Sequence, residues 1–459
     1  MSTSILSRAR FALRPSCAVR AALIVALGHL AAPAIRAQAT ATLTLTDART
    51  AARQVSPDLM AAREAVAAAR GRERQAGAYQ NPTFGVSREQ SSGGGQSNSQ
   101  NIALLEQPIE LGGLRSARRD AASARREAAE ARLVLAEAQL DYDVTRAYAL
   151  AIAAERRAAL ADQATAAFTE ALRVSERRLA AGDVSGYTNR RLKLEAARYG
   201  TLRAEAVLAR RSARIALASL VTTTSDSIGG VGPILADSVP TSATSASAES
   251  LLPVALRSRA ELRAAVAEAR AAEADARLAA SERMPIPVVS GGIKSERVGA
   301  TGGGSQGLTG LVAGLALPLP LWDRRAGSIE AADAEARRRV AELDGQRRRV
   351  AREVAEAYDA SRAADAQIAM LAPQLGAESR AALRAAQVAY AEGEITLVEW
   401  LDAVRAYREA EASFAALQAE STIRRAALER AVGAPLVPTT SLRPTLPGVQ
   451  PAAPSGLDR

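Results

Sequence analysis

Long stretches of the chain follow a helical pattern, in which alanine and a few larger apolar residues alternate with charged residues. The longest of them, from Arg115 to Ala181, contains no proline or glycine. Within it Leu133, Leu140 and Ala147 follow one another at intervals of seven residues, the spacing of a coiled-coil seam. At 1.5 Å per residue, a helix of about 70 residues is about 100 Å long. The pattern therefore predicts a very long helix that packs through a narrow apolar stripe.

The whole arrangement of elements occurs twice in the chain, about 210 residues apart. Each copy of the long run continues to a single glycine, Gly182 or Gly393, where the offset has changed by one residue. A register kept over such a distance indicates an element whose length must be preserved, as in a strut or the wall of a tube. Five positions of the first copy are matched at one offset by five of the second: Leu111, Asp120, Leu133, Val144 and Tyr148 by Leu321, Glu330, Leu343, Val354 and Tyr358.

Each copy is predicted to consist of a helix, two strands, the long helix and a further helix. The two shorter helices of one copy together match the length of the long one, so we expect them to lie end to end beside it. In the first copy the elements are expected at Leu45–Tyr79, Thr83–Glu89, Asn101–Ile109, Arg115–Ala181 and Tyr187–Leu220. In the second they are expected at Leu251–Arg283, Val288–Val298, Leu308–Leu317, Leu321–Ala391 and Thr396–Val432.

Neither the strands nor the helices can complete a stable structure within one chain. Two hairpins supply only four strands, which is too few for a closed barrel. The helices are rich in alanine and poor in large apolar residues, so one set of them buries little apolar surface. Association of several copies would remedy both, and three copies would supply about 12 strands, a number compatible with a membrane barrel.

The N-terminal segment has the features of a secretory signal peptide, which we assign to residues 1–39. Four arginines without an acid precede an apolar stretch from Ala21 to Ile35, and cleavage is expected after Ala37 or Ala39. An uncleaved anchor helix is disfavoured, because the apolar stretch is shorter than the about 20 residues that span a bilayer. The other expected boundaries are 40–221 for the first repeat, 222–250 for a Ser/Thr-rich linker, 251–434 for the second repeat and 435–459 for a Pro-rich, disordered tail.

Cleavage would change the chemistry that the chain can perform. The only cysteine, Cys17, and the only histidine, His29, both lie in the predicted signal peptide. The mature chain would therefore have no thiol and no imidazole, which excludes cysteine nucleophiles, histidine bases and His/Cys zinc sites. It also has no phosphate-binding loop motif. We therefore expect no metal site, no cofactor and no enzymatic activity.

The charge of the chain does not point to nucleic acid. The formal net charge is +10, and because residues 1–39 hold five arginines and no acid, about +5 remains after cleavage. Only 3% of the residues are aromatic, and no basic surface is interleaved with aromatic residues for base stacking. We therefore expect no nucleic-acid partner.

Two segments lead from the strands into the long helical runs: Q-P-I-E-L-G-G-L-R, Gln107 to Arg115, and L-P-L-P-L-W-D-R-R-A-G, Leu317 to Gly327. Together with the doubled order of elements, these segments resemble the TolC-like outer-membrane efflux proteins. The similarity is greatest to the heavy-metal, CzcC-like branch of that family. It covers residues 45–435, nearly all of the mature chain.

This resemblance implies a mainly α-helical fold with a small β part, built from two repeats of helix, strand, strand, long helix and helix. In a homotrimer the repeats would form an α-helical periplasmic tunnel, topped by a β-barrel of about 12 strands in the outer membrane. The implied partners are outer-membrane lipid, a periplasmic adaptor (membrane fusion) protein and an inner-membrane pump of the RND type. The chain itself would be a passive exit duct for substrates such as heavy-metal cations or small toxic compounds.

Two other functions share parts of this pattern. A periplasmic coiled-coil scaffold or adaptor protein would have long helical hairpins and a signal peptide, but would lack strand hairpins in both repeats. An outer-membrane duct for type I protein secretion would have the same architecture and would differ in its cargo. A scaffold should be soluble without detergent, whereas either duct should not.

Glu399 and Asp402 are the candidate pore residues. They lie in the segment Thr396–Ala403, T-L-V-E-W-L-D-A, which is similar to the family motif whose two carboxylates line the closed end of the tunnel. A spacing of three places both on one face of a helix. The resemblance implies two stacked rings of carboxylates in a trimer, which would favour cations and raise some of the pKa values. The alternative is a pair of ordinary solvated acids.

The turns that follow the long runs are candidate docking tips for the adaptor. The alternative is that both glycines simply end helices, a position where glycine is favoured. The sequence departs from the better-known branch of the family, because Ile395 stands in place of a latch arginine and Tyr187-Thr188 replaces the Thr-Asp pair that it binds. The candidate tip residues are Gly182, Asp183 and Val184 in the first copy and Gly393, Glu394, Ile395 and Thr396 in the second.

The two tryptophans carry separate expectations. Trp322 follows a strand and would lie at the membrane–water interface or pack where the barrel meets the tunnel. Trp400 lies between the two candidate pore acids and is expected to pack between helices.

Overall fold

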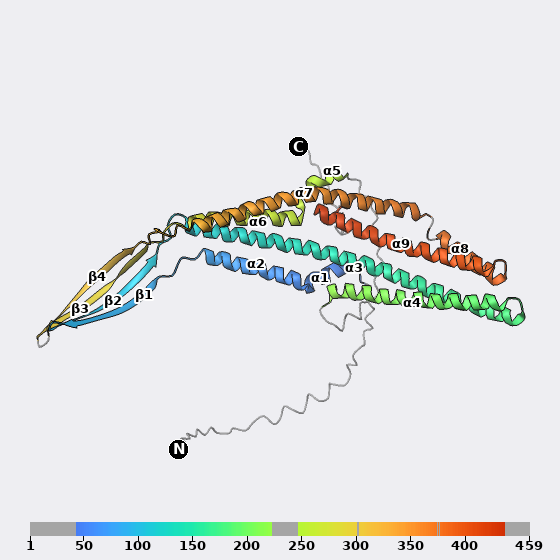
Figure 1. The fold of residues 1–459 in the computed structure, drawn as a ribbon, viewed down its shortest axis with the longest axis horizontal. Helices are drawn as coiled ribbons and strands as arrows, with labels where there is room; N and C mark the ends of the chain where they lie inside the picture. Colours follow the sequence, from blue (N-terminus) through green and yellow to red (C-terminus); the bar gives the residue numbers. More distant parts are fainter. Residues whose placement is uncertain (1–42, 223–246, 301–302, 374, 376, 437–459) are drawn as a thin grey trace, which may run out of the picture. The chain divides into compact units, whose positions relative to one another are not determined.

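The computed structural model describes residues 43–222, 247–300, 303–373, 375 and 377–436 (Figure 1). The chain divides into Met1–Thr42, which lies outside the described residues, and Leu43–Arg459. The predicted signal peptide, most of the predicted linker and most of the predicted tail also lie outside the described residues.

The predicted order of elements is present in both repeats. The first repeat contains α1 (Leu45–Val55), α2 (Pro57–Ala76), β1 (Thr83–Gly93), β2 (Gln96–Pro108), α3 (Leu114–Ala181) and α4 (Gly186–Val221). The second contains α5 (Ala248–Ser258), α6 (Ala260–Ser281), β3 (Val288–Ala300), β4 (Ser305–Ala316), α7 (Ala326–Leu371), α8 (Ala377–Glu392) and α9 (Leu397–Val432).

The first helix of each repeat is broken, whereas the sequence pattern predicts one continuous helix from Leu45 to Tyr79 and another from Leu251 to Arg283. In the first repeat the break lies at Ser56, whose Oγ accepts a hydrogen bond from the N–H of Leu59. Pro57 follows it, and proline is favoured at the first position of a helix because its missing N–H costs nothing there. In the second repeat the break lies at Arg259, without a proline. Each repeat therefore begins with a separate helix of 11 residues.

The second long run is also interrupted, so the prediction of one helix reaching Ala391 is wrong. α7 ends at Leu371 and α8 begins at Ala377. Pro373 lies in the interval, and a proline inside a helix removes one hydrogen bond and clashes with the preceding turn. The first long run has no such residue, and α3 accordingly continues for 68 residues.

The strands of both repeats form one antiparallel sheet in the order β1-β2-β3-β4. The central pair joins the two repeats, with Asn98 of β2 donating a hydrogen bond to Glu296 of β3 at 2.7 Å. All four strands are longer than the sequence pattern predicts, because pairing continues into the polar residues beside the turns. In the described residues, β1 and β4 each have a partner on one side only.

One face of this sheet is apolar, and the other is mainly polar. Side chains alternate along a strand, and residues that pair across strands share a face. Lys294 and Glu296 lie on the polar face and form an ion pair at 3.1 Å. The apolar face carries Phe84, Val86, Ala103, Leu105, Ile293 and Leu311.

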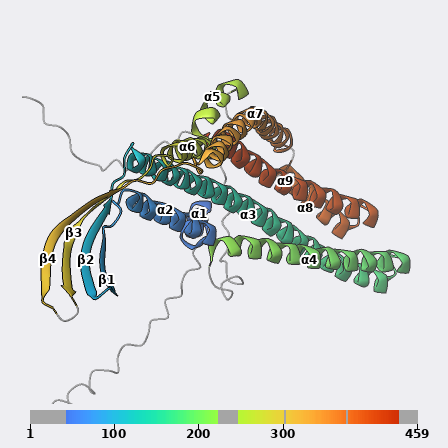
Figure 2. The same ribbon diagram turned by 60° about the vertical axis from the view of Figure 1, so that its left-hand side comes forward.

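The helices pack around α3, which contacts α2 and α4 as well as α6 and α9. α7 packs in turn against α6 and α9, and α8 packs against α9. As expected, the shorter helices follow one another end to end, α2 and α4 along α3, and α6 and α9 between α3 and α7 (Figures 1 and 2). None of the described helices has the length and apolarity needed to cross a membrane.

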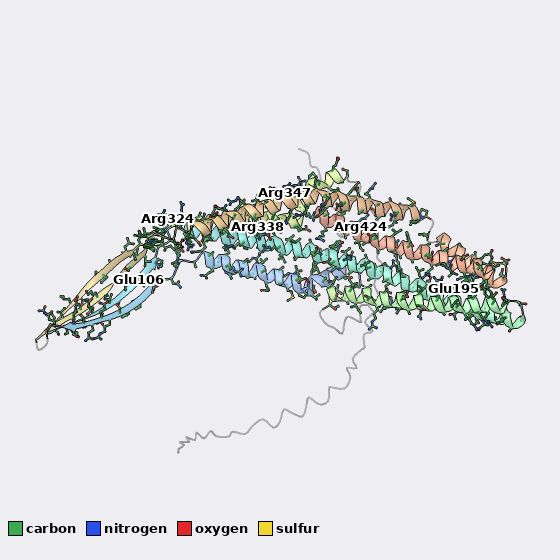
Figure 3. All side chains as sticks on the ribbon, in the orientation of Figure 1. Glu106, Glu195, Arg324, Arg338, Arg347 and Arg424 are labelled. Atoms are coloured by element: carbon green, nitrogen blue, oxygen red, sulfur yellow. The ribbon has the colours of Figure 1, made fainter. Side chains whose placement is uncertain are left out.

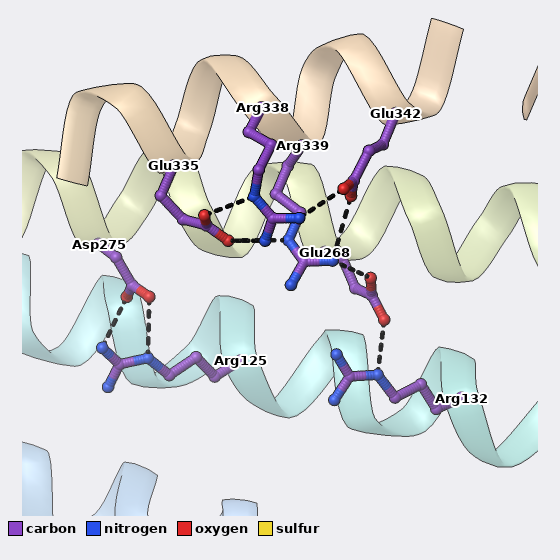
Figure 4. A network of polar contacts seen from close by, with 8 residues as sticks. All are labelled: Arg125, Arg132, Glu268, Asp275, Glu335, Arg338, Arg339 and Glu342. Carbon is purple, nitrogen blue, oxygen red and sulfur yellow. Dashed lines mark hydrogen bonds and ion pairs between the residues drawn. The ribbon is translucent and has the colours of Figure 1, made fainter. Parts of the chain in front are cut away.

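A network of ion pairs ties α3, α6 and α7 together near the strands (Figure 4). Glu268 of α6 accepts hydrogen bonds from Arg132 of α3 at 2.6 Å and from Arg339 of α7 at 3.2 Å. On α7 the hydrogen bond from Arg338 lowers the pKa of Glu335 to about 2. Exposed ion pairs contribute little stability individually. Here they link side chains of three alanine-rich helices.

Candidate functional site at the helical tips

The two helical hairpins turn through the same backbone conformation. Gly182 has a φ of +84° and Gly393 a φ of +88°, in the left-handed region that glycine adopts without strain. Both glycines therefore end their helices, as the alternative interpretation of these turns predicts. That the turns also dock an adaptor stays a separate prediction. In each turn the residue after the glycine donates its backbone N–H to a carbonyl oxygen five residues earlier, at 2.8 Å: Asp183 to Arg178, and Glu394 to Ala389.

The candidate tip residues differ in their exposure. Asp183, Glu394 and Thr396 are exposed, whereas Val184 and Ile395 are partly buried. Ile395 packs against the buried cluster between the hairpins. The two turns therefore present a carboxylate each to solvent, held on a backbone that the glycines fix.

The carboxylate of Glu399 caps α9 in the structure. Its Oε2 accepts a hydrogen bond from the backbone N–H of Thr396 at 2.7 Å and another from the Thr396 hydroxyl at 2.8 Å. The Thr396 Oγ1 accepts in return from the N–H of Glu399 at 3.3 Å, which completes a capping box. The bonds from Thr396 lower the pKa of Glu399 within one protomer.

Asp402 lies one turn further along the same face and is 68% exposed. Its nearest cation is Arg405, with 3.8 Å between the Nη1 and Oδ1 atoms. Arg405 also lies 3.8 Å from Glu195 of α4, a residue labelled in Figure 3. The two candidate pore acids thus share a face of the helix, as predicted, but their contacts differ. The carboxylate of Glu399 accepts hydrogen bonds from Thr396, whereas that of Asp402 has only a distant ion pair with Arg405.

Arg178 joins the two tips, a contact that the sequence analysis did not include. Its Nη2 atom donates to the carbonyl oxygen of Ala391 at 2.7 Å, and its guanidinium lies against Gly393. The last carbonyl groups of a helix have no partner within it, and a cation satisfies them well. The only sequence signal is a basic residue in the last turn of α3, which does not reveal its partner on α8.

An aromatic cluster holds the hairpins together just behind the tips. Phe168 of α3 stacks on Tyr199 of α4 with 4.1 Å between ring centroids. Trp400 of α9 lies 5.0 Å from Phe168 and 5.2 Å from Tyr390 of α8. Trp400 is only 2% exposed, which confirms that it packs between helices. Trp322 is 93% exposed and does not pack within one protomer.

The described residues contain no group of three or more His, Cys, Asp or Glu side chains arranged to hold a metal ion. The described tips likewise supply acids and backbone groups rather than the soft ligands that select transition metals. The absence of metal recognition by this chain stays a prediction that titration can test.

The sequence matches the family model described as "Outer membrane efflux protein" over residues 48–224 and 251–434. The chain therefore belongs to the outer membrane efflux protein family, as its resemblance implied. It is 26% identical over 310 residues to the cobalt-zinc-cadmium resistance protein CzcC of Cupriavidus metallidurans. That alignment covers 68% of this chain and 71% of CzcC.

Solved structures share the fold. A membrane protein from Pseudomonas aeruginosa matches with a TM-score of 0.68 at 23% identity, over 85% of this chain and 93% of its own. The outer membrane protein VceC of Vibrio cholerae matches with 0.64 at 22% identity, over 86% and 97%. CusC matches with 0.66 at 17% identity, over 85% and 92%. At these identities the similarity extends to the fold, which confirms the predicted fold class.

Proposed function

We propose that this protein is the outer-membrane channel subunit of a tripartite efflux system. Three copies would form a passive exit duct, which an inner-membrane pump of the RND type drives through a periplasmic adaptor. Membership in the outer membrane efflux protein family supports this function. The main observation that supports it is that a single protomer, in its described residues, has apolar surfaces without a partner on both sides of its helical part and at both edges of its sheet.

The first open edge is the outer face of α4. Tyr187, Leu194, Leu208 and Ile215 are spaced by multiples of seven and are between 41% and 73% exposed. Large apolar residues at this spacing form the seam of a coiled coil. Within the described part of the protomer α4 packs mainly against α3, with a smaller contact to α1, so no helix covers this seam.

The second open edge lies on α7 and α8. Met370 and Val388 are 70% and 55% exposed, respectively, although α7 packs against α6 and α9 and α8 packs against α9. A neighbouring copy would place its α7 and α8 against the α4 seam. Repetition of that contact closes a ring, because each protomer offers one edge of each kind.

The sheet of a single protomer also has two unpaired edges, and neighbouring copies could pair with them. β1 and β4 are edge strands in the described residues, and Phe84, Leu311 and Leu315 of the apolar face are exposed on a protomer by itself. Long unpaired apolar edges promote association with other chains. Three sheets joined edge to edge would give about 12 strands in a closed barrel whose apolar face meets lipid.

The proposed cargo is heavy-metal cations or small toxic compounds. The relative CzcC is named for resistance to cobalt, zinc and cadmium, which supports metals as one class. The mature chain would contain neither Cys nor His after loss of residues 1–39, so the choice of cargo would belong to the pump and adaptor. Gly182, Asp183, Val184, Gly393, Glu394, Ile395 and Thr396 are the proposed adaptor contacts.

Disulfide crosslinking tests the ring, since the mature chain would have no cysteine of its own. Tyr187→Cys combined with Val388→Cys should link neighbouring copies into a covalent trimer in mild detergent. Lys193→Cys with Val388→Cys is the matched control, because Lys193 points toward Glu176 of α3 rather than along the seam. A detergent-free soluble monomer, or equal crosslinking of both variants, would contradict the proposal and favour the scaffold alternative.

Planar bilayers test the proposed constriction at Glu399 and Asp402. Three copies would converge there, so Asp402→Asn should weaken cation selectivity and the block by multivalent cations. Glu394→Gln is the control for a general loss of tip charge. If the control changes selectivity and Asp402→Asn does not, the constriction lies on a different turn of the tip.

A further inference from the structure

One place where the two repeats differ is the junction at which two shorter helices meet end to end. In the second repeat the start of α6 meets the end of α9. A Cβ atom on Gly433 would lie only 2.6 Å from the Cα atom of Arg259. The Ser258 hydroxyl also donates to the carbonyl oxygen of Val432 at 3.2 Å. This junction is closed.

Arg259 fills the closed junction with its guanidinium group. The residue is 8% exposed, and its Nη2 atom donates to the carboxylate of Glu353 on α7. Its Nε atom donates to Glu261 at 3.1 Å. A buried guanidinium is stable only when carboxylates pair with it in this way. The second repeat therefore holds one cation against the carboxylate of its long helix.

The first repeat has the same junction without the cation. Ser56 occupies the break that Arg259 occupies in the second repeat, between an 11-residue helix and the next one. Asp143 precedes Val144 as Glu353 precedes Val354, and Thr222 ends α4 as Gly433 ends α9. Ser56, Asp143 and Thr222 line a cleft of about 880 Å³. The internal repeat thus supplies a filled and an open version of one site.

Two carboxylates of the open cleft, Asp143 and Asp58, have no ion-pair partner among the described residues. Asp143 accepts a hydrogen bond from the Gln139 amide at 2.8 Å and forms no ion pair there, and Asp58 at the rim forms none either. The cations that line the cleft are already engaged, Arg430 with Glu261 at 3.3 Å and Arg132 with Glu268 at 2.6 Å.

Much of the remaining wall is apolar and includes Leu59, Leu135, Leu140 and Leu220, although Glu261 and two smaller polar side chains also line the cleft. An apolar pocket with a few convergent polar groups is the usual form of a small-molecule site. From these features together, we propose that the cleft binds a small organic cation, with a guanidinium group at Asp143 and a short apolar chain along the leucines. This inference does not depend on the proposed function.

Butylguanidinium is a suitable probe, since it carries a guanidinium group on a four-carbon chain. Titration calorimetry of the full mature chain in mild detergent should show one binding site per protomer. N-butylurea has the same planar shape without the charge and should bind at least tenfold more weakly. No heat with butylguanidinium, or equal binding of both compounds, would overturn the proposal.

Variants locate the site. Asp143→Asn keeps the size of the side chain and should weaken butylguanidinium binding at least tenfold. Asp120→Asn removes the same charge from an exposed position on the same helix and should leave binding unchanged. Ser56→Arg should abolish binding, because it supplies the guanidinium that the second repeat has in Arg259. Unchanged binding to Asp143→Asn, or to a folded Ser56→Arg chain, would place the ligand elsewhere and refute the assignment.

Discussion

Replacement of Trp400 by alanine should loosen the tips selectively. The indole ring is buried among Phe168, Tyr390 and the start of α9, and it joins the second-repeat hairpin to α3. Truncation of a buried tryptophan to alanine costs about 3–5 kcal/mol, from lost burial and from the cavity left behind. The loss also removes two aromatic contacts, each worth about 0.5–1.5 kcal/mol beyond the buried area.

The effect should be local, because the described helices are joined in several separate clusters. Trp400 belongs to the cluster at the tips, whereas Val354 and Leu428 lie in a second cluster and Val144 and Leu217 in a third. Since each 1.4 kcal/mol is a factor of ten, opening of α8 and the start of α9 should become at least about 100-fold more frequent. Hydrogen exchange of the full chain in mild detergent measures this opening directly.

The second tryptophan provides the control. Trp322→Ala changes the same side chain at a position that is 93% exposed, so exchange of α8 and α9 should not change. Trp400→Phe keeps an aromatic ring in the site and should have a clearly smaller effect than Trp400→Ala. If α8 exchanges within twofold of the parent after Trp400→Ala, the cluster does not hold the tips together. The packing argument would then be wrong.

Three further predictions concern other parts of the chain. In chemical denaturation, Gly433→Ala should lower the free energy of unfolding by about 1–3 kcal/mol, because the φ of Gly433 is +71° and the new Cβ atom would meet Arg259. Gly200→Ala is the control, since Gly200 lies in open space within α4 and the change should raise the free energy of unfolding by about 0.5–1 kcal/mol. The bonds from Thr396 lower the pKa of Glu399 from 4.5, so its cap contributes fully to stability above pH 4.5 and is lost as pH falls through the lower folded pKa. Hydrogen exchange in the first turn of α9 should therefore rise at that pH in the parent, and it should already be fast at neutral pH in Glu399→Ala, which removes the acceptor of the capping box. Titration of the mature chain with zinc, copper and cobalt should show no stoichiometric sub-micromolar site.

The parts of the fold that the sequence predicted correctly depend on local signals. Gly182 and Gly393 end their helices because glycine alone adopts the left-handed conformation without strain, whatever surrounds it. The strands were placed by alternation and by the prolines and glycines that bound them. The absence of both residues predicts the first long helix, and the match to the first copy predicts the second. Such signals depend on the backbone of a few neighbouring residues and can be recognised without the rest of the molecule.

The features that the sequence analysis missed depend on distant contacts or on signals that it did not weigh. The break at Arg259 has no proline, and its tight packing involves Gly433, far along the chain. The partner of Arg178 lies on another helix of the other repeat. The interruption after Leu371 has a local signal in Pro373, and the break at Ser56 has one in Pro57. Long-range packing was therefore the physical limit at Arg259 and Arg178, whereas the other two breaks have proline signals that the prediction of continuous helices did not use.

The candidate pore acids show how a local rule can distinguish two residues that a family motif treats alike. Thr396 followed three positions later by Glu399 is a capping-box sequence, and the structure has both of its reciprocal hydrogen bonds. Capping stabilises the ionised form of Glu399, whereas a ring of like charges in a trimer would oppose it. Asp402 has no such cap and lies 3.8 Å from Arg405. Asp402 therefore lacks the local hydrogen bonds that hold the Glu399 carboxylate, and the net charge of a constriction at this level would depend on where Arg405 lies.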